Sequence, residues 1–308
     1  MKQLRLLVVS VLAGLTAFSA VAQASAPATT VAAPVVLTNK ATKHCLWEVN
    51  GKSNTVFLLG SMHAMKDEMY PLAPEMEAAY KRAGVVAFET DIKVLESPTF
   101  AMKLMSKATY PEGESLKKNL SPAMYSLLAS NLQNSLLSVE MINQFKPWMA
   151  AMTLVVLELQ KQGFNLQNGV DKHLFSRANE DQKALDHFET PDFQAELFTS
   201  LTDKESEEFL GQALKDMDVW KKQIGLLEKA WLTGDTKALD KLLLDSFREF
   251  PLMHKKLLID RNRAWIAKCE QFLKGDKDVL VVVGAGHLVG KDSVVDLLTA
   301  KGYKVEQR

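Results

Sequence analysis

Two segments at opposite ends of the chain share one pattern, and this pattern constrains the fold more than any other feature. In each, a run of apolar strand-forming residues breaks at a glycine, and a histidine follows three residues later. The first copy covers residues 56–63, Val-Phe-Leu-Leu-Gly-Ser-Met-His, and the second covers residues 280–287, Leu-Val-Val-Val-Gly-Ala-Gly-His. Buried strands flanked by helices are typical of parallel α/β sheets, which bind ligands at the carboxyl ends of their strands. The sequence therefore predicts that His63 and His287 lie at the same edge of one sheet.

The remaining strand and helix signals predict an α/β fold with a central mixed sheet. Asn50-Gly51 is a strong two-residue hairpin signal, so its flanking segments are expected to pair antiparallel. The expected strands are 45–49, 54–59, 85–88, 184–188, 279–283 and 303–305. Helical patterns fill most of the chain between the third and fifth of these strands. The expected architecture is a sheet built from both chain ends, flanked by helices, with a large helical insertion in the middle.

The first residues have the pattern of a Sec-type signal peptide. Lys2 and Arg5 precede an apolar run, and Ala22-Gln23-Ala24 is an A-x-A cleavage site. We predict cleavage after Ala24, with Ala26 and Ala22 as alternatives. The mature protein is therefore expected in a bacterial periplasm or outside the cell.

The predicted domain organisation follows from this processing. Residues 1–24 are the expected signal peptide. Residues 25–42 are rich in Ala, Pro, Thr and Val and are expected to form a disordered linker. Because the two sheet halves must meet, residues 43–308 are expected to form a single α/β domain.

Charge and hydropathy narrow the classes of partner. The chain has 37 basic and 37 acidic residues, so no net charge attracts it to nucleic acid or to an anionic membrane surface. No stretch of the mature chain approaches the length of apolar residues that a membrane-spanning helix needs. A peptide or a small molecule is the expected ligand.

Cys45 and Cys269 are the two cysteines of the chain. In an oxidising compartment an even pair is compatible with a disulfide, here between the first strand and a late helix. Two buried, unpaired thiols are the alternative. Both interpretations stay open from the sequence.

Three residues at the expected sheet edge have side chains that bind metals. His63 and His287 each follow a strand, and Glu89 follows the strand predicted at 85–88. Two imidazoles and a carboxylate suit a divalent ion such as Zn, Mn, Co or Fe, and they leave positions open for an activated water. The alternative is that each histidine only hydrogen-bonds a loop carbonyl.

Other polar residues are expected to support this site. Arg261 and Trp265 lie four residues apart on one helix, and Arg261 is predicted to pair with a carboxylate at the sheet edge or to stabilise a developing oxyanion. An ordinary structural ion pair is the alternative for Arg261. Glu189, Asp171 and Ser61 are candidate residues behind the metal ligands, although Asp171 could cap its helix and Ser61 could cap its loop.

The motifs resemble those of the TraB/GumN family (TraB/PrgY/GumN), which has the Tiki proteases of animals as relatives. The resemblance covers about residues 45–307, essentially the whole mature chain. Ser61 stands where the family usually has Thr, which also carries a hydroxyl. The matching sequence motifs are found at residues 57–63, 69–72, 85–89, 146–148, 169–171, 261–265 and 281–290.

The resemblance implies a fold like that of erythromycin esterase and the haem-binding ChaN proteins. For the Tiki branch it also implies a metal-dependent hydrolase site, which corresponds here to His63, Glu89 and His287. The function expected from the sequence is therefore an exported, peptidase-like hydrolase that uses Mn, Co or Zn. The alternative is a periplasmic binding protein that holds a haem, a peptide or a pheromone-type ligand without turnover.

Overall fold

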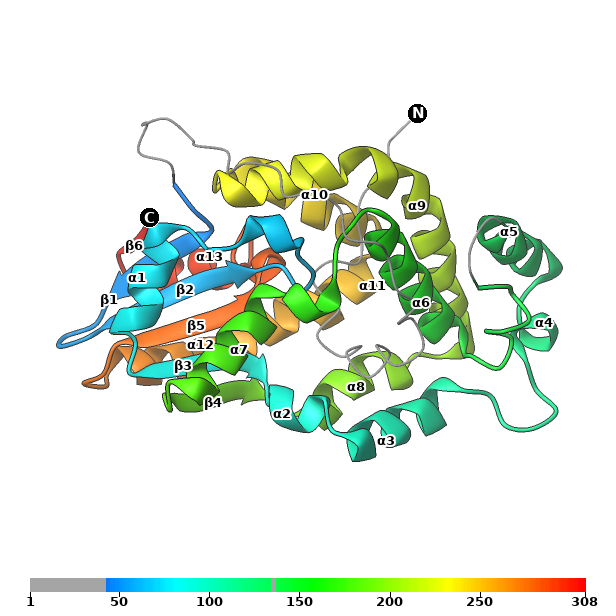
Figure 1. Ribbon diagram of the computed structural model, residues 1–308, viewed down its shortest axis with the longest axis horizontal. Coiled ribbons are helices and arrows are strands. Elements are labelled where there is room, and N and C mark those ends of the chain that lie inside the picture. The colour runs from blue at the N-terminus through cyan, green and yellow to red at the C-terminus, as the bar shows by residue number, and fades with distance from the viewer. Residues whose placement is uncertain (1–42, 134–136) are drawn as a thin grey trace.

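The computed structural model describes residues 43–133 and 137–308, and its centre is a six-stranded sheet (Figure 1). The signal peptide predicted at 1–24 and the linker predicted at 25–42 lie outside these described residues. The strand order is β4-β3-β5-β2-β1-β6. The strands are β1 Leu46–Asn50, β2 Thr55–Ser61, β3 Val85–Thr90, β4 Ala184–Glu189, β5 Val279–Gly284 and β6 Val305–Gln307.

The sheet is mixed and is assembled from both ends of the chain, as the sequence predicted. Strands β4, β3, β5 and β2 run parallel, whereas β1 pairs antiparallel with both β2 and β6. Strand β5 lies between β3 and β2, and Ser61 is in register with Gly284. The two Gly-x-x-His segments therefore leave the sheet side by side at one edge.

The predicted antiparallel pairing of the first two strands is confirmed, but the predicted two-residue turn is wrong. The register pairs Asn50 with Thr55, so residues 51–54 form the turn. Gly51 N–H donates to the Asn54 carbonyl at 2.9 Å. The Asn54 side chain donates to the carbonyls of Phe272 and Lys277, which ties the longer turn to the neighbouring loop.

The last strand begins two residues later than the sequence predicted. Helix α13, Val294–Ala300, ends in a Schellman motif, in which Gly302 N–H donates to Thr299 and Tyr303 N–H donates to Leu298. Gly302 has φ +90°, the left-handed conformation that this motif requires. Because the cap uses the Tyr303 N–H, β6 starts only at Val305.

Helices cover both faces of the sheet and extend beyond it. In Figure 1, α1 and α7 lie in front of the sheet, α12 and α13 lie behind it, and α4 and α5 lie at the far end of the molecule. The predicted helical insertion is present, and β4 divides it into two parts. The first part holds α2 Ile92–Leu95, α3 Pro98–Ala108, α4 Leu116–Asn119, α5 Pro122–Leu132, α6 Pro147–Lys161 and α7 Val170–Glu180. The second holds α8 Pro191–Thr199, α9 Asp203–Leu232, α10 Thr236–Glu249, α11 Pro251–His254, a π-helical turn at Lys255–Ile259 and α12 Asp260–Leu273. Helix α1, Pro74–Arg82, precedes the insertion and connects β2 to β3.

Local signals in the sequence explain where several helices start. Ser121 caps α5 by accepting from Met124 N–H, with a proline at the first helical position. Thr202 and Glu205 form a capping box at the start of α9. These caps satisfy amide groups that would otherwise lack partners.

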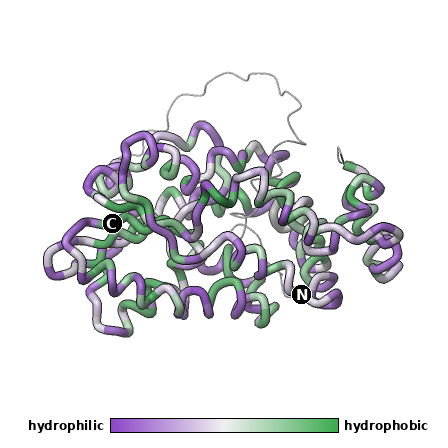
Figure 2. The backbone as a smooth tube through the Cα atoms, turned by 90° about the horizontal axis from the view of Figure 1, so that it is seen from below, coloured by the Kyte–Doolittle hydropathy of each residue, from purple (hydrophilic) through white to green (hydrophobic). Residues whose placement is uncertain are grey.

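The hydrophobic core runs through the sheet. Every residue of β2 and β5 is buried. Figure 2 shows the hydrophobic residues gathered in the interior and the hydrophilic residues mostly on the outer turns. Among the described residues, no helix combines the length and the apolar character needed to cross a membrane. The buried parallel strands thus hold the residues that follow them at one rigid edge.

Candidate functional site

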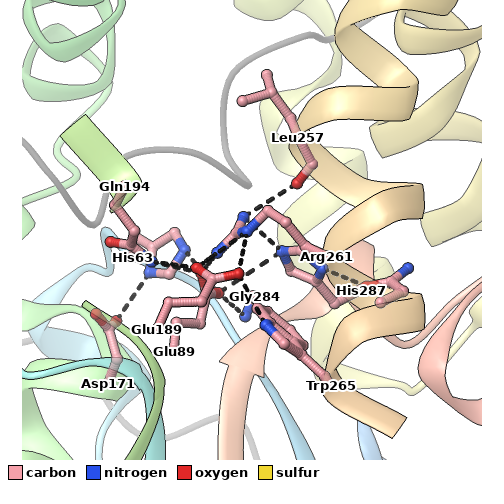
Figure 3. A network of polar contacts seen from close by, with 11 residues as sticks. His63, Glu89, Asp171, Glu189, Gln194, Leu257, Arg261, Trp265, Gly284 and His287 are labelled. Atoms are coloured by element: carbon pink, nitrogen blue, oxygen red, sulfur yellow. Dashed lines mark hydrogen bonds and ion pairs between the residues drawn. The ribbon is translucent and has the colours of Figure 1, made fainter. Parts of the chain in front are cut away.

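A cluster of charged side chains lies at the carboxyl ends of the parallel strands (Figure 3). Its members come from different elements: His63 follows β2, Glu89 lies near the end of β3, Glu189 ends β4, and His287 closes the 3-10 turn after β5. Arg261 reaches the cluster from α12. His63 is 4% exposed, Glu89 5%, Arg261 3% and His287 0%. Charges buried this deeply require partners.

Arg261 is the centre of the cluster, and all five of its N–H donors are used. Nε and Nη2 donate to the two carboxylate oxygens of Glu189, each at 2.8 Å. Nη2 also donates to Glu89 Oε2 at 2.7 Å. Nη1 donates to the Leu257 carbonyl at 3.0 Å and to His287 Nε2 at 3.1 Å. The ion pair that the sequence predicted is therefore present, with two carboxylates instead of one.

His287 is a neutral imidazole with a defined tautomer. Because Arg261 can only donate, Nε2 of His287 must be the acceptor, and Nδ1 then carries the proton. Nδ1 lies 2.6 Å from Asn262 Oδ1, which accepts this proton in a hydrogen bond. Burial and the Arg261 charge lower the pKa of His287 to about 3, in agreement with the neutral form.

Glu89 is held as a carboxylate. Oε1 accepts from the backbone N–H of Gly284 at 2.7 Å, and Oε2 accepts from Arg261. Burial alone would raise the pKa of Glu89, but the charges of Arg261 and His63 together with the hydrogen bond from the Gly284 N–H outweigh it. They lower this pKa to about 2. Glu89 is therefore ionised at neutral pH.

His63 is the cluster residue with an open position. Its Nδ1 lies 3.2 Å from Asp171 Oδ1, and its buried Nε2 has no hydrogen-bond partner among the described residues. Burial would lower the pKa of His63, but the Asp171 and Glu89 carboxylates raise it to about 9. In this arrangement His63 carries a proton at neutral pH.

The backbone of Gly284 lies next to His63 Nε2 and Glu89 Oε1. A Cβ at Gly284 would lie 3.1 Å from His63 Nε2 and 3.2 Å from Glu89 Oε1. Its φ of −52° is available to any residue. The glycine is therefore needed here for space, since two functional side chains approach its backbone closely.

The structure brings the predicted metal ligands together, and Arg261 uses a donor atom of one of them. His63 Nε2 and His287 Nε2 lie 3.8 and 3.9 Å from Glu89 Oε1. Two atoms bonded to one metal at about 2.1 Å lie about 3.4 Å apart at the tetrahedral angle and at most about 4.2 Å apart. The His63–Glu89 and His287–Glu89 distances are wider than the tetrahedral value but below this limit, whereas Arg261 already uses the lone pair of His287 Nε2. Within residues 43–133 and 137–308, no group of three or more His, Cys, Asp or Glu side chains is arranged to hold a metal ion.

Other predicted site residues take varied places. Asp171 faces His63, and the start of α7 has no side-chain cap, so Asp171 does not cap that helix. Ser61 is buried, and its hydroxyl has no hydrogen-bond partner among the described residues.

Cys45 and Cys269 are free, buried thiols, which is the second of the two alternatives left open by the sequence. The remaining histidines, His44, His173, His187 and His254, have no contact with the cluster among the interactions described.

Three residues have roles in the cluster that the sequence did not reveal. Gln194 on α8 donates to Glu89 Oε2 at 3.4 Å and to Glu189 Oε2 at 3.3 Å. Asn262 orients His287, and Trp265 Nε1 donates to Glu189 Oε1 at 2.8 Å. For Asn262 and Trp265 a signal existed, because both lie within one helical turn of Arg261. Gln194 had no such signal.

The fold and the cluster together define an α/β protein with a buried ionic centre at the carboxyl edge of its sheet, built from the two chain ends. The model of the TraB/PrgY/gumN family matches residues 45–307, so the chain belongs to that family, as its motifs suggested. The chain is also similar to the uncharacterized protein YbaP of Escherichia coli K12 and of Shigella flexneri. In both cases the identity is 26% over 246 residues, which covers 78% of this chain and 86% of the relative. No solved structure gives a significant match.

Proposed function

We propose that this protein is an exported hydrolase of amide or ester bonds, and that the cluster around Arg261 is its reaction centre. The observation that carries the proposal is His63, a buried imidazole whose Nδ1 lies 3.2 Å from Asp171 and whose Nε2 lies 3.8 Å from Glu89 without a hydrogen-bond partner among the described residues. An imidazole fixed at one nitrogen by a carboxylate and open at the other is the arrangement used for proton transfer. The partners of His63 also come from a sheet edge where α/β enzymes bind their substrates.

The proposed chemistry assigns a proton to each group. Glu89, ionised, accepts a proton from a water through Oε1 as the water attacks the carbonyl carbon of the substrate, and this proton later returns to His63, 3.8 Å away. His63, protonated, donates its Nε2 proton to the departing amine or alkoxide. The positive charge of Arg261 favours negative charge on the substrate oxygen. No step requires a group beyond these residues and water.

The test compares matched histidine variants. The mature protein is incubated with p-nitrophenyl esters and with a peptide mixture from casein. We expect wild-type hydrolysis to fall at least about 100-fold in His63→Gln, the usual loss when a general acid or base is removed. His187→Gln is the control, because His187 is exposed on β4 and has no contact with the cluster among the interactions described. An activity that is equal in wild type and His63→Gln would contradict the proposal.

A second candidate function is binding without turnover. The observation in its favour is the closed centre, in which every Arg261 donor is used and Gln194 covers both carboxylates. The polar surroundings of His63 suit a peptide or pheromone-type ligand better than a haem, which needs an apolar cleft. Under this alternative, peptides added to the protein would raise its melting temperature and be recovered uncleaved.

Export is the remaining part of the proposal and rests on the N-terminal sequence. Expression of the full chain in a Gram-negative host should place it in the periplasmic fraction with Ser25 as its first residue. A chain that retains Met1 in the cytoplasmic fraction would contradict export.

A further inference from the structure

We propose that Arg261 occupies the place of a catalytic metal in this protein: its guanidinium is the built-in cation of a site whose donors would otherwise hold a divalent ion. The proposal depends on the proposed function only in taking the cluster as the functional centre. It concerns which cation the cluster residues bind, and binding of a divalent cation is measured without a substrate.

The first argument is the set of groups that Arg261 contacts. Glu89 and His287 are two of the three residues able to ligate a metal, and Arg261 binds both through Nη2 and Nη1. A metal needs the same lone pair on His287 Nε2 that the guanidinium now uses. The guanidinium and a metal at this position are therefore mutually exclusive.

The second argument is that several separate elements hold the guanidinium in place. Leu257, in the π-helical turn before α12, turns its carbonyl to Nη1. Trp265 lies with its ring 4.9 Å from the guanidinium carbon, and its indole N–H fixes Glu189. Glu189 then binds the guanidinium through two parallel hydrogen bonds. An arginine that merely neutralised one stray carboxylate would not need these contacts.

The third argument comes from Asn262. By accepting the Nδ1 proton of His287, Asn262 leaves the Nε2 lone pair pointing into the cluster. Metal-binding histidines are prepared in the same way, by an acceptor on their second nitrogen. Removing the guanidinium should thus leave His287, Glu89 and His63 as a set of donors ready for a metal.

The test measures divalent-cation binding with Arg261 present and absent. We expect wild-type protein to purify without stoichiometric Zn, Mn or Co, with the same metal content as a His63→Ala, His287→Ala double variant. We expect Arg261→Ala to bind Zn²⁺ and Co²⁺ at one equivalent, about 10- to 100-fold more tightly than wild type. Calorimetry gives the affinity, and the visible absorption of Co²⁺ reports histidine ligation. Addition of His287→Ala to Arg261→Ala should abolish the gain.

Arg263→Ala is the matched control. Arg263 lies on the same helix, is 57% exposed and pairs with Asp292 at the surface. Its removal takes away the same charge and the same side chain outside the cluster. A gain of metal binding in Arg263→Ala equal to that in Arg261→Ala would overturn the proposal, since it would then reflect net charge alone.

A folding defect is anticipated in the design, because Arg261→Ala leaves two buried carboxylates without a cation. Arg261→Met is therefore also made together with Glu189→Gln, which removes one anion with the cation. The proposal is overturned if wild-type protein holds one equivalent of metal that the double-histidine variant loses. It is also overturned if the folded Arg261 variants bind no metal. Absence of hydrolysis in wild type would contradict the proposed function and leave these results unaffected.

Discussion

The two ring nitrogens of His63 have different surroundings, and these surroundings determine the pKa of the side chain. Nδ1 faces Asp171, which contributes most to raising the pKa of His63, whereas Nε2 lies 3.8 Å from Glu89 and has no hydrogen-bond partner within the described parts of the chain. Because the folded-state pKa is raised to about 9 from 6.5, the stability contributed by protonated His63 is fully present below pH 6.5. It is lost as the pH rises through 9.

We expect Asp171→Asn to move the titration midpoint of His63 from about 9 toward 6.5. The removed charge is the largest of those that favour the protonated imidazole. The measurement is the chemical shift of the His63 ring protons as a function of pH, with His63→Gln to assign the signal. A midpoint unchanged by the substitution would show that Asp171 does not govern His63.

Glu89 gives the opposite pH dependence. Its pKa is lowered from 4.5 to about 2, so its contribution to stability is present above pH 4.5 and is lost as the pH falls toward 2. Between pH 5 and pH 2.5, wild type should lose about 2 kcal/mol more free energy of unfolding than Glu89→Gln does. Urea denaturation at both pH values measures the difference. Equal losses in the two proteins would refute the assignment.

At the scale of elements, the end of β5 sets the width of the site. Gly284→Ala places a methyl group against His63 Nε2 and Glu89 Oε1, which must move apart by a few tenths of an ångström. We expect the variant to fold and to shift the His63 titration, with hydrolysis reduced at least about tenfold because reactive geometry tolerates little displacement.

Gly225→Ala is the control for this substitution. Gly225 lies in α9, and a Cβ there would meet nothing within 4 Å. Relative to glycine, alanine in a helix stabilises by about 0.5–1 kcal/mol. Gly225→Ala should therefore raise stability slightly and leave His63 unchanged, and a matching change in His63 would rule out a local effect of Gly284.

Strands and helices could be predicted where the local sequence of one segment is enough to specify them. The apolar runs before Gly60 and Gly284 specify buried parallel strands, and the shared geometry of such strands brought His63, Glu89 and His287 to one edge. The start of β6 was misplaced because the Tyr303 N–H belongs to a helix cap, which depends on Gly302 and Leu298 together.

The rest of the site could not be predicted because it depends on packing between distant elements. Gln194 has no sequence signal that distinguishes it from other polar helical residues. Its role follows only from the position of α8 next to Glu89 on β3 and Glu189 on β4. Likewise, the sequence predicted an ion pair for Arg261, but the number of its partners follows from the π-helical turn and from the approach of α12 to the sheet. This packing also decides whether His287 offers its lone pair to a metal or to a guanidinium.

At the scale of the whole molecule, the start of the described chain lies beside the C-terminus. His44 N–H donates to the Arg308 carbonyl, and the Gln307 side chain donates to the His44 carbonyl at 2.9 Å. Adjacent termini favour tolerance of circular permutation.

A permutant can test this arrangement. Residues 308 and 43 are joined by a short Gly-Ser linker, and new termini are opened at Gly113, where φ is +86° and an added Cβ would meet nothing within 4 Å. We expect helical content like that of the unpermuted domain and an unchanged His63 titration. A permutant that is soluble but lacks this titration would show that the cluster depends on the native chain order.

The central position of β5 has a consequence for synthesis. A ribosome makes the chain from its first residue, so β2 and β3 emerge more than 180 residues before the strand that separates them. Until residues 279–287 leave the exit tunnel, these two strands have no common neighbour, Glu89 lacks the Gly284 amide and His287 does not yet exist. The charged centre is thus among the last parts of the protein to form, and a nascent or prematurely terminated chain carries none of its chemistry.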